Sequence, residues 1–155
     1  MKKSLVIVYS YHHNNTKKVA DAMAKTLGCE IAHLDEKRYD DIPDYDVVGF
    51  GAGIDSAKHY VPMLEFAQGL HPVHNRKAFI FSTSAILGKN KVKKDHMALR
   101  EILLSKNYEI VDEFACKGYN TNSFLKYIGG MNNMHPNADD LHNAVDFVNK
   151  IMKDI

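Results

Sequence analysis

The first 28 residues combine an apolar strand, a polar loop and an amphipathic helix, and this combination limits the folds open to the chain. Residues 5–9 read LVIVY, a run whose length and β-branched content are typical of a strand buried on both faces. After the loop, apolar residues recur at helical spacing from Val19 to Leu27, and Gly28 is placed to end the helix. Strands buried on both faces belong to parallel sheets covered by helices, so this stretch favours an α/β fold.

The loop between that strand and that helix has the composition of an anion-binding loop. Residues 10–16 read SYHHNNT, which supplies hydroxyl and amide groups. The loop leads into a helix N-terminus, where the helix dipole and the first backbone N–H groups favour a phosphate. An ordinary helix cap at Asn15 explains the same residues. The loop alone leaves both interpretations open.

The rest of the chain predicts four more strands that alternate with helices. Apolar runs or two-residue alternation predict strands over residues 30–34, 46–51, 78–81 and 108–116. Helical spacing predicts helices over residues 60–69, 92–103 and 137–152, the last with Asn137 as its N-cap. The polar stretch 35–46 contains Pro43 and predicts a connection with at most one helical turn.

Five strands separated by helices predict a doubly wound parallel sheet with helices on both faces. Uniformly apolar strands belong in the centre and alternating strands at the edges, which gives the order 2-1-3-4-5. Ligands in such sheets bind at the carboxyl ends of the strands, where the order reverses beside the first strand. We therefore expect three loops to meet there, over residues 10–16, 51–59 and 82–91.

Composition narrows the classes of protein and partner. A length of 155 residues predicts one domain, residues 1–155. The balance of 20 Lys and Arg against 19 Asp and Glu argues against nonspecific nucleic-acid binding. No apolar run has the length of a membrane span, and the two cysteines lack a CxxC spacing. We expect a cytoplasmic protein with no nucleic-acid or membrane partner, either a monomer or a weak homodimer.

The histidines, Cys116, the basic run 89–94 and the segment 117–136 are each candidates for part of a functional site. The nine histidines include an adjacent pair and a His71-x-x-His74 spacing, but no Cys or carboxylate completes a metal-ligand pattern, so we expect surface histidines. Cys116 fits a small buried apolar residue better than a redox thiol. The basic run 89–94 predicts a solvated helix start, or a surface that docks an acidic redox partner. The long segment 117–136 predicts a lid or docking surface beside the cleft, or a disordered excursion.

Taken together, these stretches resemble the flavodoxin family over essentially the whole chain. YSYHHNNT is similar to the family's phosphate loop, which usually ends in Gly-Asn-Thr. Asn15 and Thr16 match that ending, while Asn14 stands at the usual glycine and His13 at a usual hydroxyl. GFGAGIDSAKHY and FIFSTSAI resemble two flavin-contacting loops, and CKGYNT and GGMNNMHPNADDL resemble a pattern near the end of one subgroup. Asp55 stands where an aromatic residue commonly stacks on the flavin.

The resemblance implies noncovalent FMN binding and electron transfer to partner proteins. The backbone N–H groups of the second and third loops would face the flavin edge that gains negative charge on reduction. Glycines at 51 and 53 would let the backbone approach the ring. The cofactor-binding residues that the resemblance implies are Ser10, Tyr11, His13, Asn14, Asn15, Thr16, Gly51, Ala52, Gly53, Ile54, Asp55, Ser82, Thr83, Ser84, Ala85 and Ile86. Residues 82–84 as ordinary turn residues at a strand end are the alternative. No catalytic residue or metal ligand is expected.

Three functions remain to be weighed. The first is an FMN protein that shuttles electrons between redox partner proteins. The second is an FMN-dependent oxidoreductase that acts on a quinone or protoporphyrinogen-type substrate. It requires space over the ring, which Asp55 in place of a stacking aromatic residue leaves open. The third is a phosphoacceptor signalling domain on the same fold. That function needs acidic residues after the first strand and an Asp at the end of the third, where this chain has Ser10-Tyr11 and Gly51.

Overall fold

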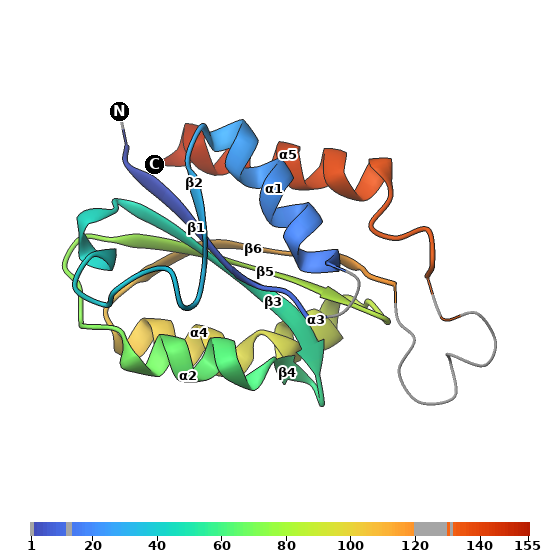
Figure 1. Ribbon diagram of the computed structural model, residues 1–155, viewed down its shortest axis with the longest axis horizontal. Coiled ribbons are helices and arrows are strands. Elements are labelled where there is room, and N and C mark those ends of the chain that lie inside the picture. The colour runs from blue at the N-terminus through green and yellow to red at the C-terminus, as the bar shows by residue number, and fades with distance from the viewer. Residues whose placement is uncertain (1, 12–13, 120–129, 131) are drawn as a thin grey trace.

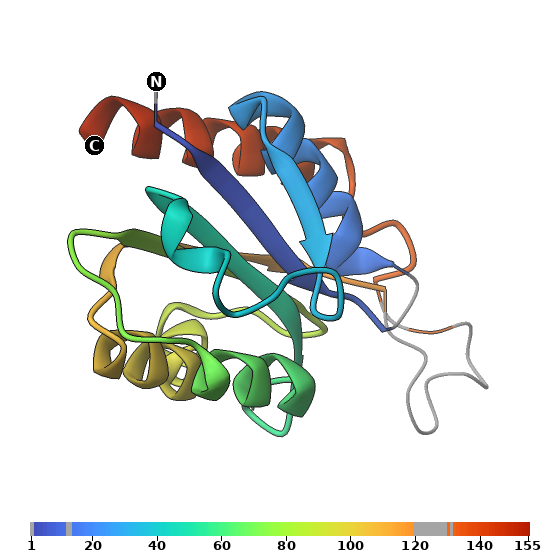
Figure 2. The same cartoon turned by 60° about the vertical axis from the view of Figure 1, so that its left-hand side comes forward.

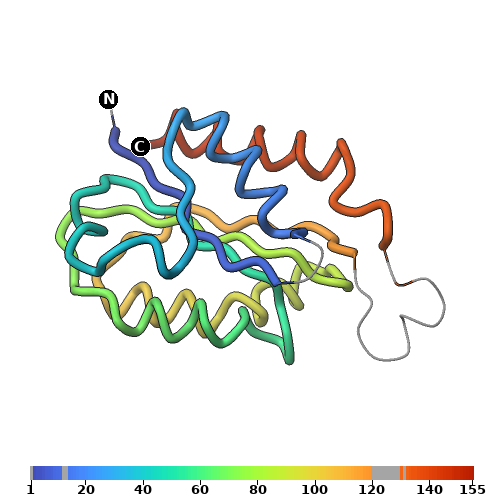
Figure 3. Tube along the Cα trace, in the orientation of Figure 1, coloured from blue at the N-terminus to red at the C-terminus, as the bar shows by residue number. Residues whose placement is uncertain are grey.

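A parallel sheet lies between two layers of helices in the computed structural model, which describes residues 2–11, 14–119, 130 and 132–155 (Figure 1). The elements in chain order are β1 Ser4–Tyr9, α1 Asn15–Leu27, β2 Glu30–His33, the 3-10 helix η1 Ile42–Asp44, β3 Val47–Asp55, β4 Lys58–His59, α2 Val61–Gly69, β5 Lys77–Ser84, α3 Lys89–Asp95, α4 Met97–Ser105, β6 Glu109–Lys117 and α5 Ala138–Asp154. Figure 3 traces the same path along the Cα atoms.

The order of the parallel strands is β2-β1-β3-β5-β6, which confirms the predicted 2-1-3-4-5 topology for the five main strands. Ile7 at the centre of β1 pairs with Ala32 of β2 and Phe50 of β3, so the first strand lies inside the sheet. The short strand β4 was not predicted. It pairs antiparallel with the end of β3 and lies off the main order.

Helices α1 and α5 cover one face of the sheet, and α2 and α4 cover the other (Figures 1 and 2). Each face has its own apolar core. On the α1 and α5 face, Met23, Phe79 and Phe81 are fully buried. On the opposite face, Phe50 and Ile80 are fully buried. Successive residues of a strand point to opposite faces, so β5 contributes side chains to both cores.

The residue before helix α1, Asn14, has a left-handed backbone conformation. Asn14 precedes the helix with φ 54° and ψ 29°, in the left-handed region, and its side chain makes no capping hydrogen bond within the described part of the chain. Asn15 is the first helical residue, so the N-cap predicted at Asn15 is one residue late. Asn tolerates the left-handed region better than most residues, so it can stand where the phosphate loop that this segment resembles usually has glycine.

The ends of the remaining helices fit the predicted signals except in one place. The carbonyl oxygen of the Asn137 side chain accepts the backbone N–H of Asp140, which confirms Asn137 as the α5 N-cap. Gly28 ends α1 in the left-handed conformation, as predicted. The helix predicted over residues 92–103 is instead two helices, because α3 ends before His96 and α4 begins after it.

Candidate functional site

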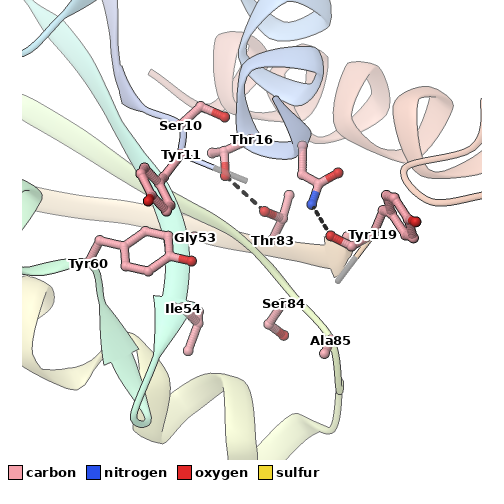
Figure 4. Close-up of a pocket in the computed structure, with 12 residues that line it drawn as sticks. Ser10, Tyr11, Thr16, Gly53, Ile54, Tyr60, Thr83, Ser84, Ala85 and Tyr119 are labelled. Carbon is pink, nitrogen blue, oxygen red and sulfur yellow. Dashed lines mark hydrogen bonds between the residues drawn. The ribbon is translucent and has the colours of Figure 1, made fainter. Parts of the chain in front are cut away.

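A pocket opens at the carboxyl ends of β1, β3 and β5, as the strand order predicts (Figure 4). The empty space within it is about 370 Å³, a volume that includes open solvent at its mouth. The N-terminus of α1 and the segment that follows β6 complete its walls. The residues that line it are Ser10, Tyr11, Asn15, Thr16, Gly53, Ile54, Tyr60, Thr83, Ser84, Ala85, Gly118 and Tyr119.

The first turn of α1 lines one side of this pocket and carries groups that suit an anion. The amide groups of a first helical turn have no carbonyl partner within the helix, and the dipole gives them positive character. One of them, the N–H of Lys17, donates to the Oγ atom of Ser10 at 3.2 Å. The hydroxyls of Thr16 and Thr83 share a buried hydrogen bond of 2.8 Å, which ties the helix to β5. The helix start is therefore held firmly beside the strand ends.

One of the two polar side-chain atoms of Asn15 has no hydrogen-bond partner among the described residues. Its Nδ2 atom donates to the carbonyl oxygen of Tyr119 at 2.7 Å. Its Oδ1 atom is buried and has no hydrogen-bond partner among the described residues. A buried acceptor without a donor costs about 1–3 kcal/mol, so a ligand that donates to Oδ1 would recover that loss. Gly118 permits the contact with Tyr119, because a Cβ atom at position 118 would lie 2.8 Å from Asn15 Nδ2.

Three tyrosine rings border the pocket. Figure 4 shows Tyr11 and Tyr60 on one side and Tyr119 on the other. The Tyr11 and Tyr60 rings meet edge to face, with centroids 6.4 Å apart and an interplanar angle of 74°. Burial raises the pKa of the Tyr60 phenol and the charge of Asp55 raises it further, so Tyr60 stays neutral near pH 7. The pocket thus has aromatic surface although Asp55 occupies the family's usual aromatic position.

The loop after β5 is fixed by three hydrogen bonds. The Oγ atom of Ser84 donates to the carbonyl oxygen of Ile86 at 2.7 Å. The Nδ2 atom of Asn132 donates to the carbonyl oxygen of Ala85 at 2.7 Å, and the N–H of Gly118 donates to the carbonyl oxygen of Ser84 at 3.0 Å. The described ends of the 117–136 segment therefore lie against this loop, beside the pocket.

Two of the glycines in β3 receive aromatic side chains from the protein itself. A Cβ atom at Gly51 would lie 2.1 Å from the Phe81 ring, and one at Gly53 would lie 2.5 Å from the Tyr60 ring. Gly51 and Ala52 pair with β5 as ordinary strand residues and are buried. The sequence-based expectation assigned the space at Gly51 and Gly53 to an approaching flavin. In the structure, neighbouring rings fill that space.

The residues implied by the resemblance fall into two sets. Those that line the pocket are Ser10, Tyr11, Asn15, Thr16, Gly53, Ile54, Thr83, Ser84 and Ala85. Those described elsewhere are Asn14 at the helix start, Gly51 and Ala52 within β3, Asp55 exposed at the end of β3, Ser82 buried in β5, and Ile86 exposed beyond the pocket. His13 lies outside the described residues.

Sequence reasoning did not select Tyr60, Gly118 or Tyr119, although each belongs to a stretch that carried the resemblance. Tyr60 reaches the pocket because β3 and β4 form a hairpin that reverses at Ser56 and Ala57. Both turn residues have positive φ, at 52° and 61°. The usual residues at such positions are Asn and Gly, so the pair Ser-Ala carries no hairpin signal.

A network of polar side chains joins the fully buried His96 to the partly exposed Arg100 and Glu113. The Nδ1 atom of His96 lies 2.9 Å from Glu113 Oε1, and Arg100 donates to Glu113 through Nε at 2.6 Å. Burial acts to raise the pKa of Glu113, but the hydrogen bonds from His96 and Arg100 outweigh it and hold that pKa at about 2. His96 is fully buried, so the expectation of surface histidines is wrong here.

His59 is the second buried histidine. Its Nε2 atom lies 3.1 Å from the carbonyl oxygen of Phe81, and its ring lies 4.8 Å from that of His96. Burial, together with the nearby His96, lowers the pKa of His59 to about 3. The ring is therefore neutral at physiological pH. The exposed pair His71 and His74, by contrast, matches the expectation from sequence.

The described part of the chain offers neither a reactive Cys116 thiolate nor a cluster of metal ligands. Burial raises the pKa of Cys116 to about 12, which removes thiolate character and supports its role as a small buried residue. Within residues 2–11, 14–119, 130 and 132–155, no group of three His, Cys, Asp or Glu side chains could hold a metal ion. In the same part of the chain, no helix is both long and apolar enough to cross a membrane.

Comparison with known proteins decides the family. A family model described as a flavodoxin domain matches residues 6–128. The chain belongs to the flavodoxin family. A curated relative, the uncharacterized protein MJ0298 of Methanocaldococcus jannaschii, is 40% identical over 151 residues, which are 97% of this chain and 99% of the relative.

Solved flavodoxins share the fold at low sequence identity. Oxidised flavodoxin 2 from Bacillus cereus aligns over 99% of both chains with a TM-score of 0.75 and 12% identity. A flavodoxin from the domain Archaea aligns over 98% of this chain and 97% of its own, with a TM-score of 0.68 and 13% identity. Membership of the flavodoxin family implies a flavin cofactor. The start of α1, which is compatible with a phosphate, fits such a group, as does the Asn15 Oδ1 atom, which has no partner in the described part of the chain.

Proposed function

We propose that this flavodoxin-family chain binds FMN noncovalently in the pocket at the strand ends and carries electrons between redox partner proteins. The observation that carries the proposal is the pocket itself. It joins a helix N-terminus, a buried acceptor at Asn15 that has no donor among the described residues, and tyrosine rings on two sides. The helix N-terminus suits a phosphate, the Asn15 acceptor suits a hydroxylated chain, and the tyrosine rings suit a flat ring.

The phosphate of FMN would be held by the first turn of α1. Ser10 and Thr16 supply hydroxyls next to the turn, and its amides supply N–H donors. Among the described residues, no lysine or arginine lines the pocket, so binding rests on hydrogen bonds and the helix dipole. Such a neutral site suits a group that is fully charged near pH 7.

The rest of the pocket would hold and shield the ring. The tyrosines supply apolar faces that exclude water, and Ser84 and Ala85 come from the loop that hydrogen bonds have fixed. Bound FMN supplies the one- and two-electron chemistry. Backbone N–H groups of this loop would stabilise negative charge gained on reduction.

An FMN-dependent oxidoreductase acting on a quinone or protoporphyrinogen-type substrate would use the same pocket. A steady-state assay separates the two functions. With NADH or NADPH and a series of quinones, a carrier gives far less than the roughly 10 turnovers per second of a median enzyme. Turnover at that rate would contradict the carrier function and support the oxidoreductase function. A cytoplasmic location and a monomeric or weakly dimeric state belong to the same proposal.

The direct test is the visible spectrum of the purified protein, with the released chromophore identified, followed by titration of the apoprotein with FMN. Thr16→Val should weaken FMN binding by about fivefold, since it removes a hydroxyl worth about 1 kcal/mol beside the phosphate site. Thr26→Val is the matched control, because Thr26 lies in the last turn of the same helix and donates to the carbonyl oxygen of Ala22. A colourless protein that takes up no added FMN contradicts the proposal.

A further inference from the structure

The loop and helix that follow the pocket expose apolar and basic side chains together. Ala85 lines the pocket, and the next two residues, Ile86 and Leu87, are exposed by 58% and 37%. Helix α3 follows at once with the sequence KNKVKKD. Lys89, Lys93 and Lys94 are exposed or partly exposed. We call residues 86–94 the basic rim.

The positive charge of the basic rim is not neutralised by its neighbours. Within the described part of the chain, Lys89, Lys93 and Lys94 form no ion pair, whereas the adjacent carboxylates are already engaged. Asp95 is paired with Lys91, and Glu113 with Arg100. The whole chain has a formal net charge of only +1, so this local excess is a property of one surface.

A shallow hollow extends the basic rim along α3. It is lined by Lys89, Val92, Lys93, Arg100 and Glu113. The guanidinium of Arg100 donates to Glu113 and to the carbonyl oxygen of Lys93. It therefore does not present a pair of N–H donors to a small anion in the hollow. What remains is an apolar floor with ammonium groups at its edge, which suits the surface of a protein better than a compact ligand.

We propose that the basic rim docks an acidic redox partner protein beside the flavin pocket. The proposal rests on the proposed function and adds the chemistry of the partner. The lysines steer a negatively charged protein during diffusion, and Ile86 and Leu87 supply the apolar contact that desolvates the meeting point. Their position next to Ala85 brings the partner to the edge of the pocket. Residues 86–94 contain no aromatic side chain, so they lack the stacking platform that single-stranded nucleic acids use.

The test uses the FMN-loaded protein and two one-electron carriers of opposite charge, an acidic plant-type ferredoxin and a basic cytochrome c. Stopped-flow mixing measures the second-order rate at which the reduced ferredoxin cluster passes one electron to the flavin protein. We expect this rate to fall at least tenfold as ionic strength rises from about 0.01 M to 1 M, because salt shortens the Debye length to about 3 Å. The rate from the reduced flavin protein to cytochrome c should rise with salt or stay constant.

Charge reversal locates the effect. Lys93→Glu with Lys94→Glu should slow the ferredoxin reaction by about 10- to 100-fold at low salt and quicken the cytochrome c reaction. Lys25→Glu with Lys153→Glu makes the same change in net charge at the far ends of α1 and α5, and should leave both rates within about twofold. If reversal loosens α3, the Lys93→Gln and Lys94→Gln pair should still give a smaller loss of the same sign. Ile86→Ser should slow the ferredoxin reaction without altering its salt dependence.

Equal effects of the two reversed pairs, or a ferredoxin rate that does not change with salt, would overturn the basic rim as a docking surface. So would binding of a single-stranded oligonucleotide that depends on Lys93 and Lys94 while ferredoxin is indifferent to them. Failure of the proposed function looks different, because the protein then takes up no FMN. In that case calorimetric titration with oxidised ferredoxin at low salt, for the parent and both reversed pairs, decides the docking surface by itself.

Discussion

The Nε2 atom of His96 lies 2.7 Å from the Oγ atom of Ser82, and both side chains are buried. With Glu113 on the other ring nitrogen, the three residues have the connectivity of a hydrolytic triad. Solvent does not reach the serine, which is 2% exposed. The arrangement instead fastens α4 to β5 and β6 directly behind the pocket.

Removing the serine hydroxyl should therefore weaken the fold. Ser82→Ala leaves a buried nitrogen of His96 without its partner, and we expect the free energy of unfolding to fall by about 1–3 kcal/mol. Ser105→Ala is the control, because Ser105 is exposed and bonds to the carbonyl oxygen of Ile102, so its cost should stay within about 0.5 kcal/mol. Urea unfolding measures both. Equal stabilities would mean that the Ser82–His96 contact contributes nothing.

Acid should destabilise the protein through His59. Burial lowers its pKa from an ordinary 6.5 to about 3, so below pH 6.5 the unfolded chain binds a proton that the folded chain does not. Stability is unaffected above that pH and falls below it by at most about 1.4 kcal/mol per pH unit. Between pH 6.5 and 4.5, His59→Leu should lose this slope, and His74→Gln, at an exposed site, should keep it. An identical slope in the parent and in His59→Leu would show that another group titrates.

The Glu113 carboxylate acts in a separate pH window. Its pKa falls from 4.5 to about 2 on folding, so its contribution is complete above pH 4.5 and disappears as the pH drops toward 2. Glu113→Gln should lower the free energy of unfolding at pH 7 by about 2–3 kcal/mol, because Arg100 and His96 lose a charged partner. The penalty should shrink below pH 4.5. Unfolding curves at pH 7 and pH 3.5 test this, and a penalty that is constant with pH would contradict it.

The left-handed residue before α1 should link backbone conformation to FMN binding. Asn14→Val places a β-branched side chain at φ 54° and should cost about 1–2 kcal/mol, with weaker FMN binding, while Asn14→Gly should preserve both properties. Asn107 has φ 68° in the turn before β6, away from the pocket. Asn107→Val should cost similar stability and leave FMN affinity unchanged. If both Val variants lost FMN affinity equally, the loss would come from lower stability and not from a changed phosphate loop.

The charge of Asp55 should lower the reduction potential of bound FMN, because an anion opposes the gain of negative charge. Asp55 is exposed and does not line the pocket, so the effect is screened. Asp55→Asn should raise the potential by at most about 40 mV, the equivalent of about 1 kcal/mol for one electron. Asp154→Asn, at the end of α5, is the control. Spectroelectrochemical titration decides, and equal potentials would place Asp55 beyond the reach of the flavin.

The order of the sheet was predictable because the pattern of each strand indicates its own burial. The unbroken run 5–9 and the apolar centre of β5 are typical of internal strands, and the alternating run 108–116 is typical of an edge. Three glycines within β3 obscured its length, since Gly51 looks like the end of a strand until its pairing with Phe81 is known. Long-range pairing of this kind has no local signal.

The polar interior was the least predictable part. His59 and His96 are far apart in the chain, and only the close approach of β4 to α4 brings their rings together. Helical periodicity continues through His96, so it does not indicate that α3 ends and α4 begins there. Nor does it indicate that the ring nitrogens of His96 bond to Ser82 of β5 and Glu113 of β6. Among the residues that line the pocket, those of the loop 10–16 were indicated by composition, and those of the other two loops only by the family resemblance. Tyr60 and Tyr119 reach the pocket through tertiary placement.

Because a Cβ atom at Gly53 would lie 2.5 Å from the Tyr60 ring, we expect these two positions to change together among related chains. A methyl group at 53 would displace the ring, so a relative with alanine there should carry a smaller residue at 60. The reverse also holds: once position 60 is small, glycine at 53 is no longer required. Two coupled substitutions, at positions 53 and 60, would therefore reshape one wall of the pocket. These two positions are the natural starting point for redesigning which ligands the pocket accepts.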